Sequence, residues 1–155
     1  MKYEPRYNKS RALIIGINKY QHAQPLDYAT NDADAIAGVL GNQYDFREED
    51  IMRLKDSEAS RNNILEAFHK YTQEGTSPDD KLVIFFAGHG HTVSGNRGEV
   101  GFLVPVDGDR DNTATLIRWD ELILNSELIS AKHILFIMDA CYGGLAFKRA
   151  LPTGT

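Results

Sequence analysis

The chain has 155 residues, of which 42% are hydrophobic and 25% charged, and its formal net charge is −5. That length fits one domain with a core of its own, and the acidic balance argues against a nucleic-acid partner, which would need a basic face. No apolar run could span a membrane, the polar N-terminus lacks the apolar segment of a secretory signal, and a single cysteine excludes an internal disulfide, so we expect a cytoplasmic protein without a membrane partner.

Strand and helix patterns alternate in the first half of the chain, as they do in α/β folds. The expected elements are a buried strand at 11–18, a helix at 31–44, a strand at 50–54 and a helix that Ser60 caps. Thr30 or Asn31 is the expected N-cap of the first helix, since short polar side chains accept hydrogen bonds from a helix's first N–H groups.

The alternation continues in the second half. The expected elements are a strand at 81–87, a small β-hairpin within 91–107, a helix at 119–129 and a buried strand at 132–138. Right-handed crossovers would make the four main strands parallel, with their carboxyl ends at one edge of the sheet. Residues 1–155 are therefore expected to form a single α/β domain.

Two of these strands run into reactive side chains. The strand at 81–87 is followed by Gly88-His89-Gly90, and the strand at 132–138 by Asp139-Ala140-Cys141. Neighbouring parallel strands would place the imidazole beside the thiol, so that the imidazole could take the thiol proton and later protonate a leaving amine. The backbone N–H groups of Gly90 and Cys141 are candidates for an oxyanion hole. A lone cysteine or histidine is more often structural, but the combination favours catalysis.

The sequence motifs around His89 and Cys141 resemble those of a known protein family. Phe-Phe-Ala-Gly-His-Gly, ending at residue 90, and Asp-Ala-Cys-Tyr-Gly-Gly, ending at residue 144, resemble the two catalytic motifs of the caspase-like cysteine peptidases. The Asp-Ala-Cys form is similar to metacaspases and their prokaryotic relatives, the orthocaspases. The separation of 141 − 89 = 52 residues is also that of caspases.

This resemblance implies a fold and an activity. The fold would be a caspase-like three-layer sandwich, with a mostly parallel central sheet flanked by helices and a small β-hairpin after the histidine strand. The activity would be that of a cysteine endopeptidase, in which Cys141 forms an acyl-enzyme and His89 acts as acid and base.

The resemblance also implies a specificity. The family's S1 pocket is lined by positions that correspond here to Asp32 and Asp139. Two carboxylates would favour Arg or Lys at P1 of a protein or peptide substrate, and Arg could pair bidentately. Asp34 competes with Asp32 for this role but misses the motif position.

No cofactor or metal is required by this chemistry. The acidic segment at 107–112 is similar to the start of a calcium loop, yet it lacks the glycine and glutamate that such loops need, so a polar turn is the better interpretation. Some metacaspases are activated by calcium, which leaves calcium activation open. His91, two residues beyond His89, is expected to be a loop residue near the cleft.

The resemblance implies further partners. The chain corresponds to the large (p20-like) subunit, so a small (p10-like) subunit or a C-terminal segment would complete the sheet. Lys148-Arg149 is a candidate for zymogen processing, by the enzyme itself or by an activating protease.

Two other functions are the alternatives. One is a catalytically silent caspase-like interaction module, against which the intact His89, Gly90 and Cys141 argue. The other is a nucleotide-binding domain, but no Gly-rich phosphate loop follows the first strand.

Overall fold

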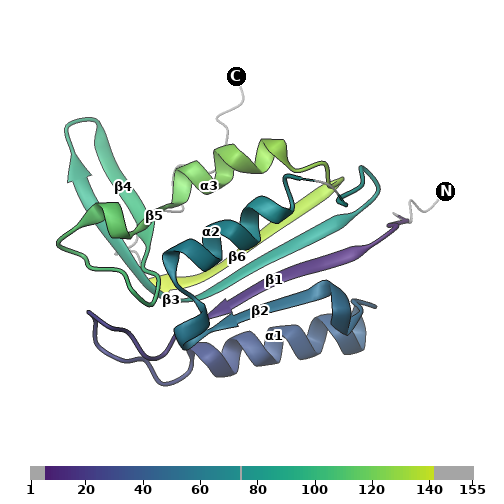
Figure 1. Ribbon diagram of the computed structural model, residues 1–155, viewed down its shortest axis with the longest axis horizontal. Helices are drawn as coiled ribbons and strands as arrows, with labels where there is room; N and C mark the ends of the chain where they lie inside the picture. The colour runs from purple at the N-terminus through teal and green to yellow at the C-terminus, as the bar shows by residue number, and fades with distance from the viewer. Residues whose placement is uncertain (1–5, 74, 142–155) are drawn as a thin grey trace.

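The computed structural model describes residues 6–73 and 75–141. In this part of the chain a mixed sheet is covered by helices (Figure 1). The strands are β1 (Ser10–Gly16), β2 (Ile51–Lys55), β3 (Lys81–Gly95), β4 (Gly98–Leu103), β5 (Ile117–Arg118) and β6 (His133–Cys141). The helices are α1 (Ala29–Gln43), α2 (Arg61–Lys70) and α3 (Trp119–Asn125), with 3₁₀ turns at Glu48–Asp50, Asp56–Glu58, Thr113–Thr115 and Ser126–Leu128.

The sheet is organised around β3. Strands β2, β1, β3 and β6 are parallel neighbours in that order, whereas β3 with β4 and β4 with β5 are antiparallel. β3 belongs to both the parallel and the antiparallel part of the sheet, because its residues 81–89 pair with β6 and its residues 90–95 pair with β4. The expected hairpin after the histidine strand is therefore confirmed, with β3 itself as one arm.

Helices cover both faces of the sheet. Val83 and Phe85 of β3 pack in the core between the sheet and α1. The alternate residues Ile84 and Phe86 pack in the core on the other face, with α2 and α3. Figure 1 shows α1 below the sheet and α2 and α3 above it. A strand buried on both faces reads as a continuous apolar run, which is the pattern found at 81–87. The expected α/β sandwich of three layers is confirmed.

The two expected helix caps had different outcomes. Ser60 caps α2 as expected, since its Oγ accepts a hydrogen bond of 3.1 Å from the N–H of Asn63. The expectation for α1 was wrong, because that helix begins at Ala29 and its N-cap residue, Tyr28, makes no side-chain cap. The Thr30 hydroxyl instead accepts a hydrogen bond of 2.7 Å from the side chain of Asn18, which ties the helix to the end of β1.

The two strands that carry the candidate catalytic residues are longer than expected. β3 continues through Gly88 and Gly90 to Gly95, and β6 continues to Cys141. Gly88 and Gly90 are therefore part of an extended strand, and the described glycines with positive φ are Gly75 and Gly98. Pairing with β6 and β4 keeps this part of β3 extended. The helix expected at 119–129 ends at residue 125 and is followed by a 3₁₀ turn.

A buried carboxylate aligns the amino ends of the parallel strands. The Asp80 side chain is fully buried and accepts hydrogen bonds from the N–H groups of Lys9 (3.0 Å) and Ser77 (2.9 Å) and from Nε of Arg11 (3.3 Å). Its carbonyl accepts from the N–H of Lys132, one residue before β6. Because the side-chain period along a strand is two, fixing the starts of β1, β3 and β6 also fixes which residues meet at their carboxyl ends.

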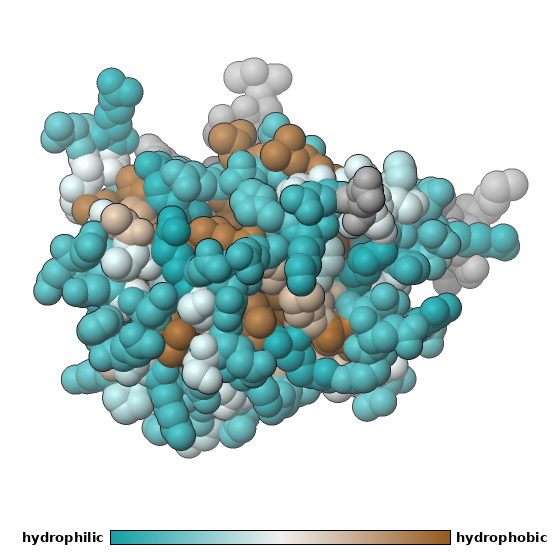
Figure 2. Space-filling model, viewed as in Figure 1, coloured by the Kyte–Doolittle hydropathy of each residue, from teal (hydrophilic) through white to brown (hydrophobic). Residues whose placement is uncertain are grey.

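The described surface is mainly polar on the face shown in Figure 2, where apolar side chains are visible over α3. Ile123, Leu124 and Leu128 are exposed in and after α3, and Leu135 is exposed on β6. None of the helices within 6–73 and 75–141 is long and apolar enough to cross a membrane.

Candidate active site

The sequence-predicted residues meet at the carboxyl ends of the parallel strands. Gly16 of β1, Ala87 of β3 and Asp139 of β6 form one row across the sheet, and two residues further on His89 is in register with Cys141. The backbone thus brings together two positions 52 residues apart in the sequence. The Cys141 side chain lies outside the described atoms, as do Gly143, Gly144 and the Lys148-Arg149 pair.

Two groups from the loop after β1 hold His89. Its backbone N–H donates a hydrogen bond of 2.8 Å to the Tyr20 hydroxyl, and the two rings lie 4.7 Å apart at 50°. Its ring Nε2 lies 2.7 Å from the backbone carbonyl oxygen of Gln24. A carbonyl can only accept, so Nε2 carries the proton and Nδ1 is the basic nitrogen of the neutral ring.

The direction of the Gly90 N–H follows from the hydrogen bonds of its neighbours. The carbonyls of Ala87 and His89 accept from the N–H groups of Ile17 and Val104, which lie on the β1 and β4 side of β3. Backbone groups alternate in direction along a strand. The N–H of Gly90 therefore points to the opposite side of β3, the side on which β6 ends at Cys141.

An acidic cavity of about 200 Å³ lies beside His89. Asp32 reaches it from the first turn of α1, and Asp139 from β6. The helix can come this close because residue 16 is glycine: a Cβ there would lie 2.7 Å from the Cβ of Ala33 and 2.8 Å from the carbonyl oxygen of Ala29. The other lining residues are Leu26, Asp27, Tyr28, Ala29, Ala87 and Gly88.

Asp32 affects the ionisation of Asp139 in this cavity. Desolvation raises the pKa of Asp139, and so do the hydrogen bond and the negative charge of Asp32. Two ionised carboxylates within hydrogen-bonding reach repel each other, which favours the protonated form of Asp139. A cation that entered the cavity would relieve this repulsion.

The competing residues lie elsewhere. The carboxylate oxygens of Asp34 are 2.9 and 3.1 Å from Nζ of Lys55, so this side chain pairs away from the cavity. His91 was expected to be a loop residue, which was wrong. It lies in β3, opposite Phe102 of the hairpin, because the strand continues past His89.

The acidic segment at 107–112 forms a polar turn. Asp107 accepts a hydrogen bond of 2.8 Å from the N–H of Arg61 at the start of α2, and Asp109 accepts one of 3.0 Å from the N–H of Asp111. Within the described residues, no group of three or more His, Cys, Asp and Glu side chains could hold a metal ion.

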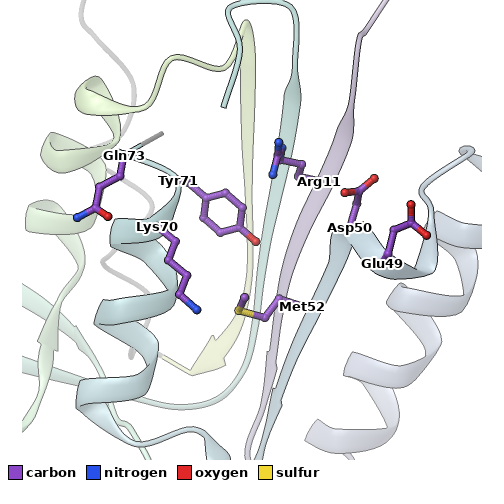
Figure 3. Close-up of a pocket in the computed structure, with 7 residues that line it drawn as sticks. All are labelled: Arg11, Glu49, Asp50, Met52, Lys70, Tyr71 and Gln73. Carbon is purple, nitrogen blue, oxygen red and sulfur yellow. The ribbon is translucent and has the colours of Figure 1, made fainter. Parts of the chain in front are cut away.

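A larger cavity, of about 940 Å³, lies at the other end of the sheet (Figure 3). In the figure Lys70, Tyr71 and Gln73 lie on one side, Glu49 and Asp50 on the other, and Arg11 near the start of β1 between them. It contains none of the sequence-predicted catalytic or binding residues. The smaller cavity is the one that lies at the carboxyl ends of the parallel strands, beside His89.

The family model of the caspase domain matches residues 9–153. The chain belongs to the caspase family. Metacaspase-1 of Eremothecium gossypii is 30% identical over 158 residues, covering 94% of this chain and 34% of that protein. Metacaspase-2 of Arabidopsis thaliana is 30% identical over 155 residues, covering 90% of this chain and 36% of that protein. The caspase domain described here is thus of the metacaspase type, a cysteine-peptidase domain.

A solved structure has the same fold. The crystal structure of protein GSU0716 from Geobacter sulfurreducens superposes with a TM-score of 0.69 at 22% identity, covering 86% of this chain and 50% of that one. The chain spans about a third of the length of the curated metacaspases that it matches.

Sequence reasoning missed two groups at the site. The Gln24 carbonyl belongs to the backbone, so no side-chain pattern marks it. Tyr20 had a weak signal, an aromatic residue four positions after the glycine that ends β1, but nothing in the sequence joined it to His89.

Proposed function

We propose that the protein is a cysteine endopeptidase that cleaves after Arg or Lys, with Cys141 as nucleophile and His89 as acid and base. The observation that carries this proposal is the register of His89 with Cys141 beside a cavity that contains Asp32 and Asp139. The alternation of β6 also puts position 141 on the face of the sheet that carries Asp139.

The chemistry is acyl transfer. Nδ1 of His89 takes the proton of the Cys141 thiol, and the thiolate attacks the substrate carbonyl carbon. The N–H groups of Gly90 and Cys141 stabilise the oxyanion that forms. His89 then gives its proton to the leaving amine, and water hydrolyses the thioester. The Gln24 carbonyl stabilises the imidazolium, because it accepts from Nε2 in both protonation states.

The acidic cavity is the S1 pocket in this proposal. Asp32 and Asp139 would pair with the guanidinium or ammonium of the P1 residue, and the side chains of Leu26 and Tyr28 supply apolar surface for its methylene stem. An acidic P1 side chain would meet the three carboxylates of Asp27, Asp32 and Asp139, and no Lys or Arg lies among the residues that line the cavity.

A peptide series that differs only at P1 tests this specificity. With the full-length protein we expect cleavage of the Arg and Lys peptides and about 100-fold lower kcat/KM for Gln and Asp. Equal cleavage of the Asp and Arg peptides would contradict the proposal. The chemistry needs no cofactor, so an absolute requirement for calcium in this series would indicate an activation step outside the catalytic residues.

The raised pKa of Asp139 gives this specificity a pH dependence. A basic P1 residue needs the ionised carboxylates, and Asp139 binds a proton at a higher pH than an ordinary aspartate does. As the pH falls from neutral, KM for the Arg peptide should therefore rise before ordinary carboxyl groups titrate. Asp139→Asn should remove this rise, and a wild-type KM that is flat down to the ordinary carboxyl range would contradict it.

The raised pKa of Asp139 also predicts that this group stabilises the fold more in acid, where binding of a basic P1 residue is weaker. Because the folded protein binds the Asp139 proton more tightly than the unfolded chain, this group stabilises the fold fully below its unfolded pKa and loses that contribution as the pH rises through its folded pKa. Asp139→Asn should therefore raise the unfolding temperature at neutral pH and leave it unchanged in acid. Thermal unfolding at the two pH values measures this difference.

We further propose that the rest of the protein covers β6. Within the described residues β6 pairs with β3 alone, and Leu135 on this strand is 55% exposed. An apolar cavity of about 440 Å³, lined by Ile36 and Val39 of α1 and by Leu135 and Ile137, opens beside it. Proteins rarely leave such an edge unprotected. A C-terminal segment, or a small subunit released by an activating protease, would add the next strand.

Hydrogen exchange measures this cover directly. The amides of β6 should exchange more slowly in the full-length protein than in the 155-residue chain, whereas those of β2 (Ile51–Lys55), the opposite edge of the same sheet, should not change. A 155-residue chain that is monomeric, stable and fully active would contradict the proposal.

A further inference from the structure

Tyr20 contacts both the backbone and the ring of the candidate catalytic histidine. Its hydroxyl accepts the His89 N–H at 2.8 Å, and its ring lies 4.7 Å from the imidazole at 50°. The first contact fixes the backbone of His89, and the second limits the rotation of its imidazole ring.

The backbone around Tyr20 is itself fixed on both sides. The N–H groups of the two residues before it donate to one oxygen of the Asp56 carboxylate, at 2.8 and 3.0 Å. The N–H of the residue after it donates to the Val106 carbonyl at 3.0 Å. The ring is therefore held by a segment that cannot shift without the loss of three hydrogen bonds.

Gly88 makes room for the Tyr20 hydroxyl. A Cβ at this position would lie 2.5 Å from Oη of Tyr20 and 3.0 Å from the ring of Phe86. Burial raises the pKa of Tyr20 to about 12, so the hydroxyl beside the histidine stays neutral at physiological pH. The glycine before His89 is thus explained by this close approach.

We propose that Tyr20 is a positioning residue, which holds His89 so that Nε2 donates to the Gln24 carbonyl and Nδ1 accepts the proton of the nucleophile. This inference rests on the proposed peptidase function. Tyr20 does not line the acidic cavity, so it should act on the chemical step and not on the binding of P1.

The test compares Tyr20→Phe with Tyr71→Phe in the full-length protein. Tyr71 is a matched control, since its hydroxyl also bonds a backbone group, the Ala12 carbonyl at 3.3 Å, and burial also raises its pKa to about 12. Its contacts lie at the amino end of β1, away from His89. Both substitutions delete one hydrogen-bonded hydroxyl and keep the ring.

We expect Tyr20→Phe to lower kcat for an Arg peptide about 10-fold and to leave KM within about 2-fold, because one lost hydrogen bond in the transition state corresponds to about that factor. The pH of half-maximal alkylation of Cys141 by iodoacetamide, followed on the peptide that contains it, should move up toward the value of a free thiol. Tyr71→Phe should lower the unfolding temperature but leave kcat and the alkylation profile within about 2-fold of wild type.

A double-mutant cycle with Gly88→Ala supplies a second measurement. This substitution should lower kcat in the wild type and have a smaller effect in the Tyr20→Phe background, where the clashing hydroxyl is absent. Additive effects, an unchanged kcat in Tyr20→Phe, or an equal loss in Tyr71→Phe would overturn the role of Tyr20.

Failure of the peptidase function gives a different result. Wild-type protein that cleaves none of the peptides would refute that function, and the alkylation profiles of Tyr20→Phe and Tyr71→Phe would still decide whether Tyr20 positions His89.

Discussion

Cys141→Ala and His89→Ala are each expected to lower kcat for an Arg-P1 peptide by roughly 10⁴-fold or more, the loss seen when one member of a catalytic pair is removed. The two positions are in register on adjacent parallel strands, and Nδ1 is the basic nitrogen of the His89 ring. Without the thiol no acyl-enzyme forms. Without the imidazole no base takes the thiol proton, and a free thiol, with a pKa of about 8.5, is mostly protonated at neutral pH.

His91→Ala is the matched control for the histidine. It lies two residues further along β3, opposite Phe102 of the hairpin, and has no part in the proposed chemistry. Its kcat should stay within about 2-fold of wild type. Because both groups act in one step, the double variant Cys141→Ala, His89→Ala should be little worse than either single variant. Activity above about a tenth of wild type in either single variant would contradict the pair.

Asp139→Asn and Asp32→Asn are expected to lower kcat/KM for Arg and Lys peptides roughly 30- to 100-fold each. Each removes one negative charge from a cavity that a cation would fill, and contacts of this kind are worth about 2 kcal/mol or more when one partner is lost. The loss should be larger for Arg than for Lys, since only Arg can pair in bidentate form. Steady-state kinetics with the two peptides measures both effects.

Asp34→Asn is the control for the aspartates. Asp34 lies on the same helix as Asp32, but its carboxylate pairs with Lys55 at 2.9 Å and does not line the cavity. Its substitution should change kcat/KM by less than about 2-fold, because exposed ion pairs contribute little. If Asp34→Asn impaired cleavage as much as Asp32→Asn, the assignment of the S1 pocket would be wrong.

Much of the fold could be predicted because apolar alternation is a local signal. The apolar runs at 11–18 and 81–87 became strands covered on both faces, and Ser60 capped its helix. The strand at 132–138 was also expected to be buried, which was wrong, since Leu135 of β6 is exposed. The continuation of β3 to Gly95 could not be predicted, since it depends on antiparallel pairing with β4 and not on local preference. The start of α1 was missed because the bond from Asn18 to Thr30 is a tertiary contact.

The candidate site was only partly readable from the sequence. His89 and Cys141 stood out because each follows an apolar run and has small residues close to it in the sequence. Asp32 and Asp139 are 139 − 32 = 107 residues apart and were found through the family resemblance, not through spacing. That they share one cavity, where the pKa of Asp139 is raised, emerges only from the packing of α1 against Gly16.

The most direct measurement is the mass of the full-length protein after reaction with two peptidyl electrophiles, one with Arg and one with Asp at P1. A Cys141 thiolate activated by His89 beside two carboxylates should give one adduct, on Cys141, with the Arg compound, and none with the Asp compound. Equal labelling by both compounds, or an unmodified Cys141 in the folded protein, would contradict the account.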